Sequence, residues 1–193
     1  LIHKKMKNFK TIALALVVAF TSVTAIAQNK KVNIEKSSIK WVGKKVTGQH
    51  DGTIKLNSGT LVFEGKKLKG GLFEVDMTSI TVADLEAGKG KEKLEGHLKA
   101  DDFFGTDKYP TSKLEFKKIA SKGSDIYTVT ADLTIKGITQ SITFDIALGD
   151  STARTTLKID RTKYDIKYGS GSFFDNLGDK AINDEFELTV VLA

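Results

Sequence analysis

The 193-residue chain carries 30 lysines and arginines against 24 aspartates and glutamates, a formal net charge of +6, and it contains no cysteine. A chain of this length is typical of one domain with a sizeable hydrophobic core. The lack of cysteine excludes disulfides and a lipid anchor attached through cysteine.

The first residues have the composition of a targeting segment. Four lysines precede the apolar run TIALALVVAF, and small residues follow up to Ala27. This pattern predicts a signal peptide over residues 1–27, cleaved after Ala27, with Met6 as an alternative start. The apolar run is shorter than the ~20 residues that a membrane span needs. We therefore expect a mature domain over residues 28–193 in the periplasm or in a secreted space.

Removing the leader also changes the charge. Without its four lysines the chain has 26 basic and 24 acidic residues, a net of +2. No basic stripe interleaved with aromatic residues is present in the sequence. Nucleic-acid binding is therefore not expected.

Most of the remaining chain alternates between apolar and polar residues with a period of two, which is typical of antiparallel strands buried on one face. After a short leading strand at residues 32–34, eight principal strands are predicted, with a turn at residues 48–52 and a bend at Gly59. Their approximate positions are residues 38–47, 53–63, 70–82, 114–116, 127–135, 142–148, 157–161 and 186–192. Long strands joined by short turns predict a closed barrel or a sandwich, because open sheet edges are a liability.

One segment departs from this pattern. Residues 83–98 are rich in Glu, Lys, Leu and Ala and predict a helix, although three glycines weaken it. Phe103 and Phe104 follow, and Pro110 begins a new extended segment. We expect a helical cap over the sheet around residues 83–104.

The strand parity places several large side chains on the inner face. In a barrel they would line the interior, whereas in a sandwich they would form its core. The candidate ligand-binding residues on this face and in the cap are Trp41, Phe63, Phe73, Phe103, Phe104, Phe116, Leu133, Phe144 and Ile159.

Two polar residues are candidates for binding a ligand's head group. Arg161 shares the inward parity of Leu157 and Ile159, so it would either meet an anionic head group or be satisfied by a salt bridge within the fold. His50 is interpreted as a residue of the turn at the barrel rim. Catalysis and metal binding are not supported, because His50 and His97 lack a third ligand and no nucleophile elbow, P-loop or dinucleotide fingerprint is present.

The ordered motifs resemble the YceI-like family of polyisoprenoid-binding periplasmic proteins, with Ala131 standing where glycine would be expected. The matching segments are WVG (41–43), GQHDG (48–52), VDMTSI (75–80), HLKADDFF (97–104), YP (109–110), ADLTIKGIT (131–139), RTKYDI (161–166) and LGD (177–179). The resemblance implies a lipocalin-like, eight-stranded antiparallel barrel whose apolar tunnel holds an isoprenoid such as a polyprenyl phosphate or a quinone. It implies no other cofactor and suggests a homodimer.

Three alternatives remain open. The barrel could bind a fatty acid or its amide through Arg161 or His50. It could be a lipid-modifying enzyme that uses His50 or the adjacent Asp101 and Asp102, or a β-sandwich interaction protein without a pocket.

Overall fold

The computed structural model describes residues 27–193, and within them nine β-strands, one α-helix and three short 3-10 helices. The strands are β1 (Ala27–Lys31), β2 (Ser38–Lys45), β3 (Gly48–Glu64), β4 (Lys67–Val82), β5 (Thr111–Gly123), β6 (Ile126–Ile135), β7 (Ile138–Leu148), β8 (Ala153–Asp160) and β9 (Ile182–Leu192). The helices are η1 (Ile34–Lys36), α1 (Lys91–Lys99), η2 (Arg161–Tyr164) and η3 (Gly178–Lys180).

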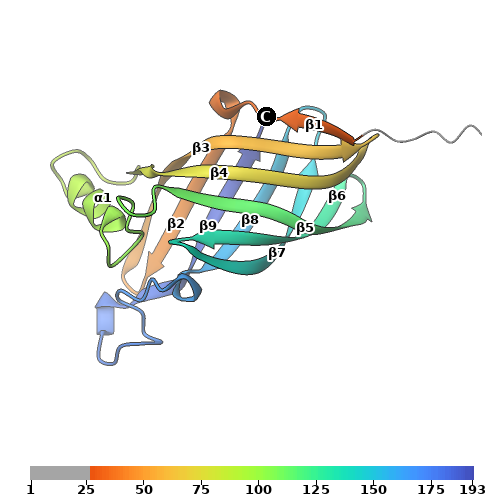
Figure 1. The fold of residues 1–193 in the computed structure, drawn as a ribbon. Helices are drawn as coiled ribbons and strands as arrows, with labels where there is room; N and C mark the ends of the chain where they lie inside the picture. Colours follow the sequence, from red (N-terminus) through yellow and green to blue (C-terminus); the bar gives the residue numbers. More distant parts are fainter. Residues whose placement is uncertain (1–26) are drawn as a thin grey trace, which may run out of the picture.

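Strands β2 to β9 form a closed antiparallel barrel. Along the sheet the order is β3-β2-β9-β8-β7-β6-β5-β4, and β4 pairs back onto β3. β1 is an additional strand that pairs with the far end of β3, beyond the reach of β2. The predicted eight-stranded barrel is thus confirmed, and Figure 1 shows the strands running along it with α1 at one end.

The inner face of the barrel follows the period-two pattern apart from breaks at register shifts, one of which lies in β3. Ile54 and Leu56 face inward, and the register then shifts between Leu56 and Ser58. Leu61 and Phe63 are consequently buried on the opposite parity. The bend expected at Gly59 lies next to this bulge, where a Cβ would come within 2.9 Å of the Phe73 ring.

The junction between β7 and β8 is the shortest pairing in the barrel. Only three residue pairs join these strands, from Ile146 to Leu148, whereas ten pairs join β6 and β7. Further along, η2 lies against β7, and Gln140 Nε2 donates a hydrogen bond to the Lys163 carbonyl at 3.2 Å.

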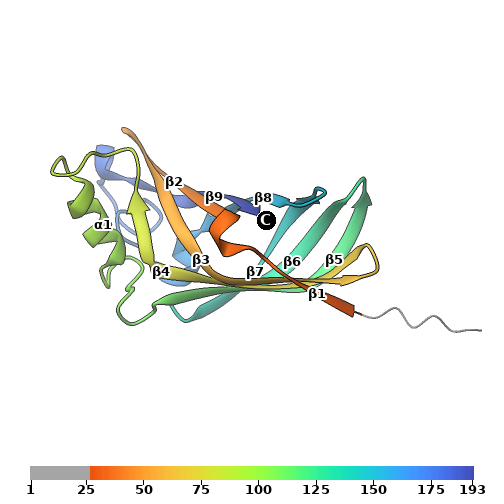
Figure 2. The same cartoon turned by 90° about the horizontal axis from the view of Figure 1, so that it is seen from above.

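Two segments of the chain cover the same end of the barrel. They are α1 with the turn that holds Phe103 and Phe104, and the loop from η2 to β9 (Figures 1 and 2). The opposite end carries the β3–β4, β5–β6 and β7–β8 turns. Any ligand inside the barrel therefore meets two different ends, one covered by α1 and the loop from η2 to β9, the other bordered by turns and by β1.

The turn predicted at residues 48–52 is wrong. The chain turns at Val46 and Thr47, and residues 48–52 belong to β3, paired with β2. The glycine at position 52 serves close packing, because a Cβ there would lie 1.8 Å from the Thr81 carbonyl oxygen and 2.7 Å from the Trp41 ring.

Two further boundaries differ from the prediction. The helical cap is confirmed, but α1 begins at Lys91 because Gly88 and Gly90 adopt φ of +74° and +102°, outside the helical region. The leading strand is β1 rather than residues 32–34, where the Asn33 side chain accepts a hydrogen bond from the Lys36 N–H and starts η1. The signal peptide lies almost wholly outside the described residues and stays a prediction.

Candidate functional site: an apolar cavity inside the barrel

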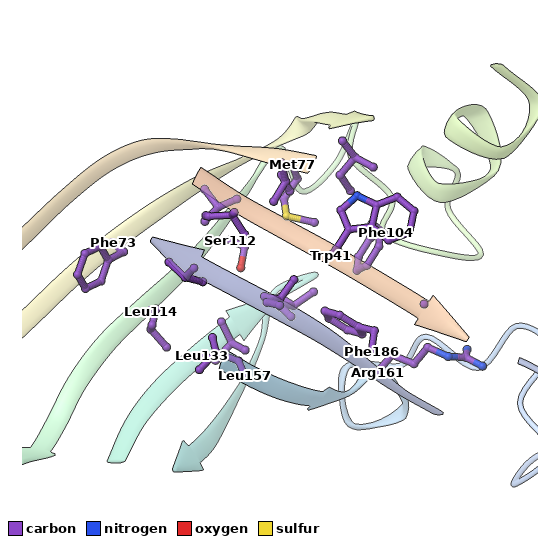
Figure 3. Close-up of a pocket in the computed structure, with 18 of the residues that line it drawn as sticks. Trp41, Phe73, Met77, Phe104, Ser112, Leu114, Leu133, Leu157, Arg161 and Phe186 are labelled. Atoms are coloured by element: carbon purple, nitrogen blue, oxygen red, sulfur yellow. The ribbon is translucent and has the colours of Figure 1, made fainter. Parts of the chain in front are cut away.

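The barrel encloses a cavity of about 170 Å3. Its walls are mostly apolar, and every strand of the barrel from β2 to β9 contributes residues to the lining. Figure 3 shows part of this lining, with Trp41 close to Phe104. Three of the lining residues form an aromatic cluster, in which Phe116 packs against Phe73 at 5.6 Å and against Phe144 at 5.8 Å between ring centroids.

The helical cap closes one end of this cavity. Leu98 of α1 and the adjacent Phe103 and Phe104 belong to the lining. The two phenylalanine rings meet edge to face at 5.1 Å, and Phe104 contacts Phe186 of β9 in the same manner at 6.2 Å. The aromatic pair that stood out in the sequence therefore forms a lid over the interior.

Trp41 lies below this lid. Its indole lines the cavity, and Nε1–H donates a hydrogen bond to the Thr81 carbonyl at 3.2 Å. Gly52 provides the space for the ring between β2 and β4. Because Trp41 is the only tryptophan in the chain, its fluorescence reports directly on what enters the cavity.

Eight of the eleven residues predicted from the sequence line the cavity, and three do not. Those in the lining are Trp41, Phe73, Phe103, Phe104, Phe116, Leu133, Phe144 and Arg161. Ile159 belongs to the packed core and is 1% exposed. Phe63 lies beyond the β3 bulge and lines a separate pocket at the far end, and His50 sits at the rim.

Sequence reasoning also missed part of the wall. Met77, Leu114 and Leu188 share inward parity with predicted neighbours, so the alternation contained the signal for them. Leu98 on the helix and Ile182 at the start of β9 carried no such signal, because their place at the cavity depends on how the cap and the loop fold back.

Arg161 is the buried charge at the capped end. It is 2% exposed, and its guanidinium donates to the carbonyls of Ile166 at 2.9 Å, Tyr168 at 2.8 Å, Ile182 at 3.0 Å and Asn183 at 3.0 Å. These bonds engage four of the five N–H groups of an arginine. The geometry therefore favours the interpretation in which Arg161 is satisfied within the fold, here by fastening the loop after η2 to the barrel.

Burial and neighbouring charges shift the pKa values of Arg161 and of the ionisable side chains around it. Burial lowers the pKa of Arg161, opposed by the charges of Asp184 and Asp160. Burial alone would raise the pKa of Asp184, but hydrogen bonds from Ser170 and Ser172 and the charge of Arg161 lower it overall. Burial and the charge of Asp160 raise the pKa of Tyr164 to about 12, so this phenol stays neutral at physiological pH.

His50 anchors the connection that leads to the cap. It lies in β3, and its Nδ1–H donates to Asp84 Oδ2 at 2.8 Å, while the other carboxylate oxygen accepts the Asp51 N–H at 3.1 Å. Burial alone would raise the pKa of Asp84, but the hydrogen bonds from His50 and Asp51 outweigh it and hold that pKa below its usual value.

Replacing Asp84 with asparagine should lower stability at pH 7 by roughly 0.5–1 kcal/mol. Because the folded-state pKa of Asp84 is depressed, its stabilisation is present above about pH 4 and lost as pH falls through that lowered value. Thermal melts at pH 7 and at about pH 2 should therefore show a smaller difference between wild type and variant in acid. Asp107→Asn, at an exposed position without an ion pair among the described residues, is the control. An equal loss at both pH values would contradict this assignment.

The hydroxyl groups among the lining residues already make hydrogen bonds within the fold. Ser112 Oγ donates to the Thr134 carbonyl at 2.8 Å, and Thr155 Oγ1 donates to the Asp145 carbonyl at 2.7 Å. Across residues 27–193 no group of three or more His, Cys, Asp or Glu side chains could hold a metal ion. Over the same residues, no helix has the length and apolar character needed to cross a membrane.

A scan against family models matches residues 30–193 to the YceI-like domain. The chain belongs to the YceI-like family. The E. coli relative "Protein YceI" is 28% identical over 97 residues, which are 50% of this chain and 48% of that protein. A UPF0312 protein of Shewanella denitrificans is 32% identical over 85 residues, 44% of this chain and 42% of the other. The matched part thus spans about half the length of these curated relatives.

Solved structures show the same barrel. Burkholderia cenocepacia BcnA superposes with a TM-score of 0.67 at 23% identity, covering 83% of this chain and 98% of BcnA. A Saccharophagus degradans domain, described as polyisoprenoid-binding and implicated in plant cell wall breakdown, gives a TM-score of 0.60 at 17% identity, covering 84% of this chain and 95% of that domain. At these identities the likeness establishes the YceI-like fold.

Proposed function

We propose that this YceI-like barrel binds, and thereby carries or stores, a single-chain lipid of the isoprenoid type without changing it chemically. The observation that carries the proposal is the cavity: it lies inside the barrel, is lined mostly by apolar side chains and is covered at one end by an aromatic lid. The description of the S. degradans neighbour as polyisoprenoid-binding supports the same ligand class. A polyprenyl phosphate or a quinone has the required chain.

The energetics favour a ligand rich in methylene and methyl groups. Burial of each such group contributes ~0.8 kcal/mol, so a few isoprene units suffice for tight binding once the cost of ordering the chain is met. The leader predicted over residues 1–27 would place the protein in the periplasm or a secreted space, where a nearly insoluble chain needs shielding from water. A homodimer, suggested by the family resemblance, is compatible with this role.

Native mass spectrometry of protein purified without detergent, followed by solvent extraction, tests the proposal. A discrete added mass that extracts as a prenyl lipid is the expected result. If the extract contains a fatty acid or a fatty-acid amide, the ligand belongs to that alternative class and not to the isoprenoids. Chemically altered lipid after incubation with the protein would overturn the non-catalytic role. A bare mass, together with unchanged Trp41 fluorescence on adding geranylgeraniol, would overturn lipid binding.

Leu114→Phe should close part of the cavity. Leu114 lines the wall on β5, opposite Leu133, so an added ring would occupy space that a ligand needs. We expect the Kd for geranylgeraniol, read from Trp41 fluorescence, to rise about tenfold, the equivalent of losing roughly two buried methylene groups. Leu72→Phe is the matched control, because Leu72 lies on the outer surface of β4 and is 56% exposed. Equal affinities for the two variants would argue against this cavity as the site.

A further inference from the structure

A second hollow lies at the end of the barrel opposite α1. It has a volume of about 520 Å3 and is bordered by the β3–β4 and β7–β8 turns and by β1. Its inner wall is apolar and its rim carries charges of both signs. The apolar wall includes Val32, Leu61, Phe63 and Leu148, and the rim includes Lys30, Lys31, Lys66, Asp125 and Asp150.

The end pocket and the interior cavity have one lining residue in common. Leu192, the last residue of β9, is the one residue that belongs to both linings. It is 5% exposed and pairs with Ala153, which offers little bulk beside it. Leu192 is therefore the residue at which a chain reaching from one space into the other would pass.

The sizes of the two spaces bear on the proposed ligand. The interior cavity alone, about 170 Å3, resembles an engineered cavity of ~150 Å3 that takes up benzene, so it holds only a short apolar group. Together the two spaces amount to about 690 Å3, within the ~300–1,000 Å3 typical of sites for larger ligands. A chain of several isoprene units needs both.

The two ends also differ in what they offer a polar head group. At the capped end Arg161 donates four hydrogen bonds to backbone carbonyls, and Ser112 donates to Thr134. The end pocket, in contrast, has a rim of lysines and aspartates that face solvent. A head group left at this rim stays hydrated while its chain is buried.

We propose that the end pocket is the second half of the ligand site. A single-chain amphiphile enters there and passes Leu192 tail first. Its polar head stays at the end pocket, while its tail reaches Trp41 beneath the aromatic lid. Leu192 then determines the chain length that the barrel accepts. This inference rests on the proposed lipid-binding function and adds to it the path and orientation of the chain.

Substitution of Leu192 tests the path. Geraniol, farnesol and geranylgeraniol, which lengthen by one isoprene unit each, are titrated against Trp41 fluorescence. Leu192→Ala should tighten geranylgeraniol about tenfold and leave geraniol unchanged, and Leu192→Phe should weaken geranylgeraniol alone by a similar factor. Leu157→Ala, which enlarges the interior cavity without bordering the end pocket, should show no such length dependence. A change that is the same for all three alcohols would overturn the proposal.

Quenching of Trp41 tests the orientation in the unmodified protein and so does not depend on how well the Leu192 variants fold. A geranylgeranyl chain brominated at its far end should quench Trp41 strongly, and one brominated next to the head should not. The reverse order would overturn the proposed orientation. If no alcohol binds the wild type at all, the lipid-binding function itself fails; if all bind but neither length nor label position matters, only this inference fails.

Discussion

Replacing Arg161 with leucine should destabilise the protein by about 3–5 kcal/mol, the loss typical of removing one partner from a buried charged network. The leucine would keep the apolar part of the packing but leave four backbone carbonyls without donors, including those of Tyr168 and Asn183. Chemical denaturation at pH 7 measures the effect, and proteolysis within residues 165–181 should accelerate because this loop loses its attachment.

The chain offers a matched control for this experiment, since Arg154 is its other arginine. Arg154 is exposed on β8, so Arg154→Leu should change stability by no more than about 0.5 kcal/mol. If the two variants were equally stable, Arg161 would not be fastening the loop. If Arg161→Lys instead weakened anionic ligands more than neutral ones, Arg161 would be assigned the role of binding an anionic head group.

Replacing Gly52 with alanine should cost about 3 kcal/mol, at the upper end for an overpacked site. The new Cβ would lie 1.8 Å from the Thr81 carbonyl oxygen, a backbone atom that moves only if β3 and β4 separate. The separation would also break the hydrogen bond from Trp41 to Thr81. We therefore expect a lower melting temperature and a red-shifted Trp41 emission in the folded variant.

Gly43→Ala is the control for this change. Gly43 lies on β2, and a Cβ there would meet nothing within 4 Å. Its stability should stay within about 0.5 kcal/mol of wild type, with unchanged Trp41 emission. Similar melting temperatures for the two alanine variants would show that the strands around Gly52 yield more easily than the close packing indicates.

The barrel could be predicted from the sequence because the alternation of buried and exposed residues is visible within each strand. Alternation such as that of Tyr127, Val129, Ala131 and Leu133 needs only a pleated strand with one buried face, and the structure buries all four. The same local rules explain the errors. Gly52 looked like a turn residue because its reason for being glycine is the Trp41 ring on the neighbouring strand, and no local pattern reveals that contact.

The candidate site was only partly predictable, for a related reason. The inward parity of Phe73, Phe116 and Phe144 could be read from the sequence, but a filled and a hollow interior have the same alternation. Arg161 was correctly expected to point inward, yet its partners are carbonyls of a loop whose path depends on the whole fold. Leu192 looked like any other strand residue until the two spaces on either side of it were visible.

The short pairing between β7 and β8 has a consequence for how the barrel fluctuates. Cooperative opening in proteins begins where the fewest backbone bonds must break, and three residue pairs hold this junction against ten at its neighbour. Within the closed barrel, the β7–β8 junction is therefore held by the fewest backbone pairings. We therefore expect local opening of the barrel to begin with separation of β7 from β8, before the longer pairings elsewhere are lost.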